Sequence, residues 1–165
     1  MDDKNRKTEE TLHGLVDLLN QALRIEYTLI IHYPRIANLI RDEETRKLAN
    51  ELGAASIYHA DVVSNIITKL GGKPDWSFEL FPEGVGIKKI FQNQLARERL
   101  ALQLHRGSAE LMSSSPHSGA LSNLAREEEQ HIKIVEQILS KLNNHLLFHI
   151  LSYLRLFSFL FVNLL

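Results

Sequence analysis

Two stretches of the chain carry residue types that bind metal ions, and they carry them at the same spacing. Glu26 precedes His59 by 33 residues, and Glu98 precedes His131 by 33 residues, so the second stretch repeats the first at an offset of 72. Carboxylate oxygens and imidazole nitrogens suit Fe, Mn or Zn ions. Apolar residues follow the same offset, which pairs Leu23 with Leu95, Leu52 with Leu124, Val63 with Val135 and Ile66 with Ile138.

The two stretches differ at one position that matters for chemistry. Glu128 lies three residues before His131, and residues three apart share one face of a helix. The equivalent residue before His59 is Ser56, and no nearby carboxylate replaces it.

The other histidines are expected to play lesser parts. His105 lies two turns after Glu98, at the position equivalent to Tyr33. We predict a core or supporting role for it, and a compensating metal ligand is the alternative. Four histidines have no partner at a metal-like spacing and are expected at the surface: His13, His32, His117 and His145.

The candidate ligands lie on apolar helix faces, which places them in a protein core. A buried lone carboxylate is costly to keep ionised, and several facing one another repel. A divalent cation removes both problems. A single Glu-x-x-His is common by chance on helices. A glutamate and a histidine in register in both halves of an internal repeat, with Glu128 beside the second histidine, are much more specific. The candidate ligands are Glu26, His59, Glu98, Glu128 and His131.

Four helices are needed to position these residues. Three- and four-residue steps predict a first helix from about 11 to 40, which Pro34 kinks without stopping it. A second helix ends at Leu70, because Gly71, Gly72 and Pro74 form a strong stop signal. Further helices are expected at 87–112 and 120–142.

The connections determine how the helices are arranged. Residues 71–86 have no helical period, and sixteen extended residues span roughly 50 Å, enough to cross a bundle. The turn at 113–119 is short, so the last two helices pack antiparallel. The predicted fold is all-α, with two antiparallel hairpins and one long crossover. We divide the chain into a flexible N-terminus (1–10), the bundle (11–142) and a hydrophobic C-terminal segment (143–165).

Composition excludes several classes of protein. The chain of 165 residues has a net charge of -1, which gives no general attraction to nucleic acid. The absence of cysteine excludes disulfides, zinc–thiolate sites and iron–sulfur clusters. The polar, mixed-charge N-terminus is not a secretory signal. We therefore expect a cytoplasmic protein.

The residues and spacing over about 12–142 resemble the ferritin-like di-iron carboxylate family, in its bacterioferritin and rubrerythrin branch. Two further stretches share this resemblance, LNQALRIE at 19–26 and KLGGKP at 69–74. The resemblance implies a ferritin-like bundle in which Glu26 and Glu98 are single carboxylate ligands. Glu128 would bridge or chelate, and His59 and His131 would each cap one metal. Ser56 departs from the family pattern, which has Glu there. Two divalent ions held by three carboxylates would keep one uncompensated positive charge, so we expect the metal near His131 to bind normally and the metal near His59 to bind weakly.

The same resemblance implies a function and partners. Family members oxidise Fe(II) with O2 or peroxide, so we expect two Fe ions, with Mn or Zn as alternatives, in a ferroxidase-like or rubrerythrin-like oxidoreductase that forms at least a homodimer. No catalytic residue beyond the metal ligands is predicted. No haem is expected, because Met1 and Met112 are the only methionines. The alternative is a non-catalytic structural or partner-binding bundle with a degenerate site.

The last twenty residues, 146–165, differ in composition from the rest. They contain no acidic residue and a single arginine, Arg155, among Leu, Phe, Ile and Val. Twenty helical residues reach about 30 Å, the thickness of a bilayer core. Three interpretations remain open: a membrane anchor, a fifth helix buried in the subunit or its assembly, or an altered reading frame at the end of the gene.

Overall fold

The computed structural model describes the backbone of residues 3–162 and the side chains of residues 9–144. Within these limits the chain forms four helices and no strand. They are α1 (Asp3–Leu39), α2 (Glu43–Lys69), α3 (Ile87–Leu111) and α4 (Ser118–Val162). The all-α class predicted from the sequence is therefore confirmed.

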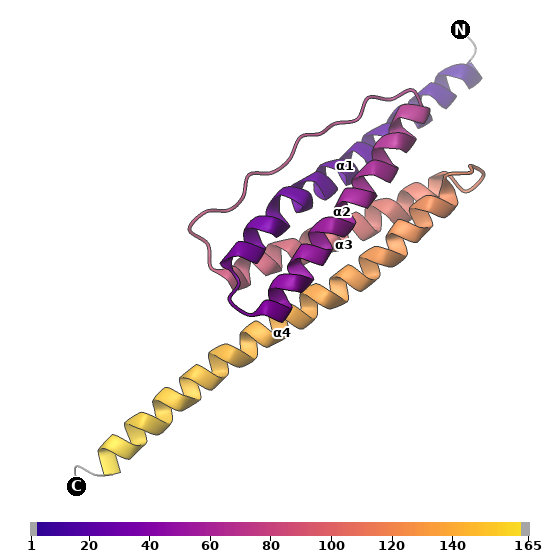
Figure 1. Cartoon of the computed structure of the whole chain (residues 1–165). Helices are drawn as coiled ribbons and strands as arrows, with labels where there is room; N and C mark the ends of the chain where they lie inside the picture. The colour runs from indigo at the N-terminus through magenta and orange to yellow at the C-terminus, as the bar shows by residue number, and fades with distance from the viewer. Residues whose placement is uncertain (1–2, 163–165) are drawn as a thin grey trace.

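The helices form two hairpins that pack side by side. α1 contacts α2 and α3 contacts α4, and the hairpins meet through α1 against α3 and α2 against α4. The connection between α2 and α3 runs alongside the bundle from one end to the other (Figure 1). This is the predicted arrangement of two hairpins and a long crossover.

Local signals in the sequence determine the ends of α2. Asp42 caps its N-terminus, where the carboxylate accepts a hydrogen bond from the Thr45 amide at 2.8 Å. At the other end, Gly71 adopts a φ of 78°, and the amides of Gly71 and Gly72 donate to the carbonyls of Thr68 and Ile67. This pair of bonds is a Schellman motif, in which glycine is the favoured residue.

The crossover is fixed to α1 by polar contacts along its length. Asn20 donates to the Lys73 carbonyl and accepts from the Asp75 amide. Further along, the Glu79 amide donates to Thr28, and the Glu79 carbonyl accepts from Nε2 of His32 at 2.9 Å. The crossover therefore covers one side of α1.

His32 is buried, so its predicted place at the surface is wrong. The crossover explains the difference, because the Phe81 ring packs edge-on against the imidazole at 5.3 Å between centroids. His13 is exposed, as predicted, and His117 is half-buried. The side chain of His145 lies outside the described residues.

α1 continues through Pro34 to Leu39, so the proline does not stop the helix, as predicted. α2 approaches α1 closely at this point. A Cβ added at Gly53 would lie 3.0 Å from Cβ of Tyr33, which is tighter than ordinary contact. Gly53 therefore lets the two helices of the first hairpin pack closely at Tyr33.

The apolar core has two parts with a polar layer between them. One part lies toward the α3–α4 turn and includes Leu19, Leu23, Val63, Ile67 and Leu124. The other lies toward the α1–α2 turn and includes Leu29, Leu52, Phe91, Val135 and Ile138. On every helix the candidate metal ligands fall between these two parts.

α4 differs from the prediction at its C-terminal end. It does not end near 142 but continues without a break to Val162, beyond the rest of the bundle (Figure 1). Over the described side chains, no helix is long and apolar enough to cross a bilayer. The side chains of residues 146–165 lie outside the described part of the structure. The contacts predicted for them, with lipid, the bundle or another subunit, therefore stay predictions.

Candidate metal centre

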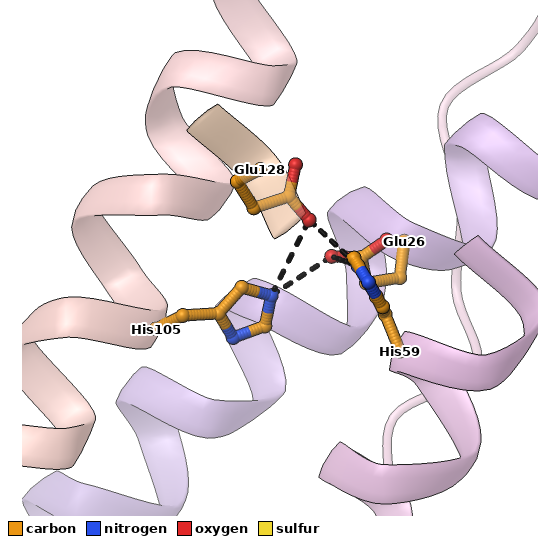
Figure 2. Close-up of side chains that lie close together, drawn as sticks. All are labelled: Glu26, His59, His105 and Glu128. Atoms are coloured by element: carbon orange, nitrogen blue, oxygen red, sulfur yellow. Dashed lines mark hydrogen bonds and ion pairs between the residues drawn. The ribbon is translucent and has the colours of Figure 1, made fainter. Parts of the chain in front are cut away.

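The five predicted ligands lie together in the polar layer, and His105 joins them. All six side chains are buried, with Glu26 from α1, His59 from α2, Glu98 and His105 from α3, and Glu128 and His131 from α4. Figure 2 shows four of them pointing toward one another from four different helices. The bundle therefore brings residues as far apart in the sequence as Glu26 and His131 into one cluster.

The first group contains Glu26, His59, His105 and Glu128. Each offers one ligand atom, and these atoms lie within 4.8 Å of one another. His59 Nδ1 lies 2.7 Å from Oε1 of Glu128 and 3.5 Å from Oε1 of Glu26. His105 Nε2 lies 2.9 Å from that Glu26 oxygen. The group thus presents two carboxylate oxygens and two imidazole nitrogens to one point.

The second group contains Glu98, Glu128 and His131, whose ligand atoms also lie within 4.8 Å of one another. His131 Nδ1 lies 3.3 Å from Oε2 of Glu128 and 3.5 Å from Oε2 of Glu98. Oε1 of Glu128 faces the first group and Oε2 faces the second. Glu128 therefore has the orientation of a carboxylate that bridges two ions.

Two further side chains orient the ligands. The hydroxyl of Tyr33 donates a hydrogen bond to Oε1 of Glu98, within the core. Nε2 of His59 donates to Oε2 of Glu127 at 2.9 Å, and Glu127 is about half exposed. A histidine that binds metal through one nitrogen commonly donates from the other to a carboxylate. Glu127 thus connects the buried group to the surface.

Burial and hydrogen bonding shift the pKa values of the first group. Burial works to raise the pKa of Glu26, but hydrogen bonds from His105 and His59 outweigh it and lower the pKa to about 2. Burial works to lower the pKa of His59, but its bonds with Glu128 and Glu26 raise it to about 11. In the metal-free protein, the charged imidazolium of His59 therefore neutralises the carboxylate of Glu26.

The second group also retains protons. Burial, together with the charge of Glu26, raises the pKa of Glu128 to about 8, although the neighbouring imidazoles of His131 and His59 oppose this. Burial opposes the charge on His131, but the neighbouring carboxylates of Glu128 and Glu98 raise its pKa to about 9. At neutral pH both groups bind protons in the positions where a cation would bind. Metal binding displaces such protons.

The cluster leaves polar atoms without partners, which tests whether metal ions fit. Buried polar groups in folded proteins are nearly always hydrogen-bonded. Here several ligand atoms have no hydrogen-bond partner in the described structure: Oε2 of Glu26, Glu98 and Glu128, and Nδ1 of His131. Three of these atoms approach one another in the second group: Oε2 of Glu98, Oε2 of Glu128 and Nδ1 of His131. The residues present fit a pair of divalent ions.

Ser56 is buried three residues before His59, and its Oγ has no partner either. No described carboxylate occupies the place that Glu would fill there, as the sequence predicted. The structure instead brings His105 into the first group, where the sequence favoured a core or supporting role. The repeat held the signal for His105, because it aligns with Tyr33, which also reaches the centre. Nothing in the sequence distinguished Glu127 from Glu129.

Comparison with known proteins identifies the family. The family model of the ferritin-like domain matches residues 16–144 of this chain, and the chain therefore belongs to the ferritin-like family. The resemblance stated from the sequence is confirmed. No curated protein matches the chain.

Solved structures agree with this assignment. A ferritin-like di-iron carboxylate protein of Bacillus anthracis is 16% identical with a TM-score of 0.71, over 84% of this chain and 99% of its own. A Rhodobacter capsulatus bacterioferritin, which has a dinuclear site and haem iron, is 27% identical with a TM-score of 0.64, over 80% and 87%. A dodecameric thioferritin of Bacteroides fragilis is 18% identical with a TM-score of 0.68, over 85% and 96%.

Proposed function

We propose that the protein handles iron, binding two Fe(II) ions per chain in the bundle and oxidising them. One observation carries the proposal: the two oxygens of Glu128 face two separate Glu–His groups inside the core. The ligands are the five predicted from the sequence, Glu26, His59, Glu98, Glu128 and His131. The bacterioferritins and di-iron proteins that the chain resembles support iron as the metal.

The reaction has a simple balance. Two Fe(II) ions become two Fe(III) ions, and the two electrons pass to O2, which takes up two protons and becomes H2O2. With peroxide as the oxidant, the same two electrons and two protons give two molecules of water. Iron is the substrate here, and its two ions supply the electrons.

The side chains have defined tasks in this proposal. Carboxylates and imidazoles hold the ions, and the apolar core on both sides excludes bulk water. Glu128 bridges and gives up its proton when metal binds, because its pKa of about 8 keeps it protonated at neutral pH. Tyr33 retains its proton, since burial raises its pKa well above the usual value, and so it continues to hold Glu98.

The assembly is inferred from the same relatives. We propose a homo-oligomer of at least two chains, supported by the dodecameric Bacteroides fragilis relative. Manganese or zinc would occupy the same ligands in an alternative loading. A bundle without catalysis is the competing function, and it predicts no redox turnover.

The test is iron binding followed by oxidation. The metal-free full chain is titrated with Fe(II) without oxygen, and bound iron per chain is measured. Air or peroxide is then added and the Fe(III) absorbance is followed, with H2O2 quantified. Two irons and repeated turnover are expected. The Glu129→Gln variant is the control, because Glu129 lies at the surface and pairs with Arg106. Absence of bound iron, or oxidation no faster than in buffer, would overturn the proposal.

A further inference from the structure

His105 occupies a position that reaches the centre in both halves of the repeat. It aligns with Tyr33 at the offset of 72. Tyr33 donates its hydroxyl proton to Glu98, and so supports a ligand. His105 instead directs Nε2 toward Glu26 at 2.9 Å and toward Oε1 of Glu128 at 3.8 Å. The same place in the fold thus carries a supporting phenol in one half and a nitrogen donor in the other.

The group around His59, which lacks a carboxylate at Ser56, is the one that His105 joins. The group around His59 has four ligand atoms with His105 included, and the group around His131 has three. The rings of His59 and His105 lie 5.9 Å apart between centroids and are nearly perpendicular. Both are fully buried. Their nitrogens therefore approach one point from two directions, as two ligands of one ion do.

We propose that His105 is a metal ligand that replaces the carboxylate missing at Ser56, and that the two metal sites are consequently unequal. This rests on the metal centre of the proposed function. The site around His59 has two nitrogens and two oxygens, and it is the tighter one. The site around His131 has one nitrogen and two oxygens. This order is the reverse of the expectation drawn from Ser56 alone.

The donor sets also give the two sites different metal preferences. Imidazole suits Zn, Fe, Cu and Ni, whereas carboxylate-rich sites suit Mn and Mg. The site around His59 should therefore favour Zn(II) or Co(II) over Mn(II) more strongly than the site around His131 does.

The experiment compares His105→Gln with the parent chain. Glutamine retains a hydrogen-bond donor for Glu26 but is a poor ligand, so it separates metal binding from mere support of Glu26. The metal-free full chain is titrated with Zn(II) by calorimetry and with Co(II) by visible absorption. The parent should show a tight and a weak site. In the variant the tight site should weaken by more than about 10-fold, with a changed Co(II) spectrum.

Two further variants complete the test. His32→Gln replaces a buried histidine outside the cluster and should leave both affinities unchanged. His105→Gln combined with Ser56→Glu restores a fourth carboxylate and should recover tight binding. Circular dichroism checks folding, and if His105→Gln does not fold, His105→Asn and the double variant replace it.

The outcomes separate this inference from the proposed function. If the affinity of the tight site and the Co(II) spectrum are the same in His105→Gln as in the parent, His105 is not a ligand and the inference is overturned. If the affinity falls but neither chain oxidises Fe(II), the inference stands and the proposed function fails. If the parent binds no metal, both are overturned.

Discussion

The two hairpins of the bundle contribute unequally to one centre. Each retains a glutamate and a histidine of the repeat. At the other two equivalent positions, α1–α2 supplies Tyr33 and Ser56 where α3–α4 supplies His105 and Glu128. The second hairpin thus provides four candidate ligands and the first provides two. The comparison teaches that the two halves of a duplicated scaffold can carry different side chains at equivalent positions and still direct them to one centre.

The largest effect is expected from Glu128→Gln, which removes the one carboxylate shared by both sites. Because each oxygen faces a different group, both ions should bind more weakly, by more than the roughly 100-fold upper range of outer-shell changes. Zn(II) calorimetry on the metal-free chain measures this, with Glu129→Gln as the matched control. Loss of a single site would show that Glu128 does not bridge.

The next-largest effect is expected at Glu127, which contacts His59, the candidate ligand on α2. Glu127→Gln removes the carboxylate that accepts from Nε2 of His59, so the tighter site should weaken by about 10- to 100-fold. The site around His131 should change little. Competition between Zn(II) and a chelator separates the two affinities. Equal weakening of both sites would contradict the assignment of Glu127 to the His59 side alone.

Tyr33→Phe tests the supporting position opposite His105. Without the phenol, Oε1 of Glu98 is buried and lacks its donor, which should lower the free energy of unfolding of the metal-free protein by about 1 to 2 kcal/mol. Urea unfolding measures the change. Tyr58→Phe is the control, because Tyr58 is exposed on α2. If the two variants are equally stable, Tyr33 does not stabilise the centre through Glu98.

The smallest effect is a pH dependence of the free energy of unfolding that arises from His32 in the first hairpin. The second hairpin lacks it, because Leu104 is at the equivalent position. Burial lowers the pKa of His32, although its bond to the Glu79 carbonyl opposes this. The unfolded chain therefore binds the proton more readily, and stability is lost as pH falls below about 6.5. Urea unfolding of metal-free His32→Gln should show a shallower acid loss. His13→Gln, at the exposed histidine, should match the parent.

The fold was predictable from the sequence because its signals are local. Helical periodicity, the Gly71-Gly72 stop and the length of the crossover fix the hairpins without knowledge of distant contacts. The positions of the five candidate ligands were predictable for the same reason, since a core-facing stripe brings them together in any such bundle. The end of α4 was not. The sequence predicted an end near 142, but the residues there include no glycine or proline to stop a helix.

The remaining differences depend on contacts between distant segments. His32 became buried because the crossover lies against α1, which periodicity on α1 alone does not show. The approach of His105 to Glu26 depends on the packing of α3 against α1 and on a side-chain rotamer. The bond between Glu127 and His59 depends equally on how α4 faces α2.

The bridging position of Glu128 has a consequence for the chain as a polymer. His59 and Glu128 are separated by 69 residues, and the long crossover lies between them. An ion bound to both would act as a reversible cross-link between the hairpins. A permanent link closing a loop of this length removes roughly 4 kcal/mol of unfolded-chain entropy at 25 °C in the simplest treatment. With metal bound, a protease cut in the crossover should leave the two halves associated.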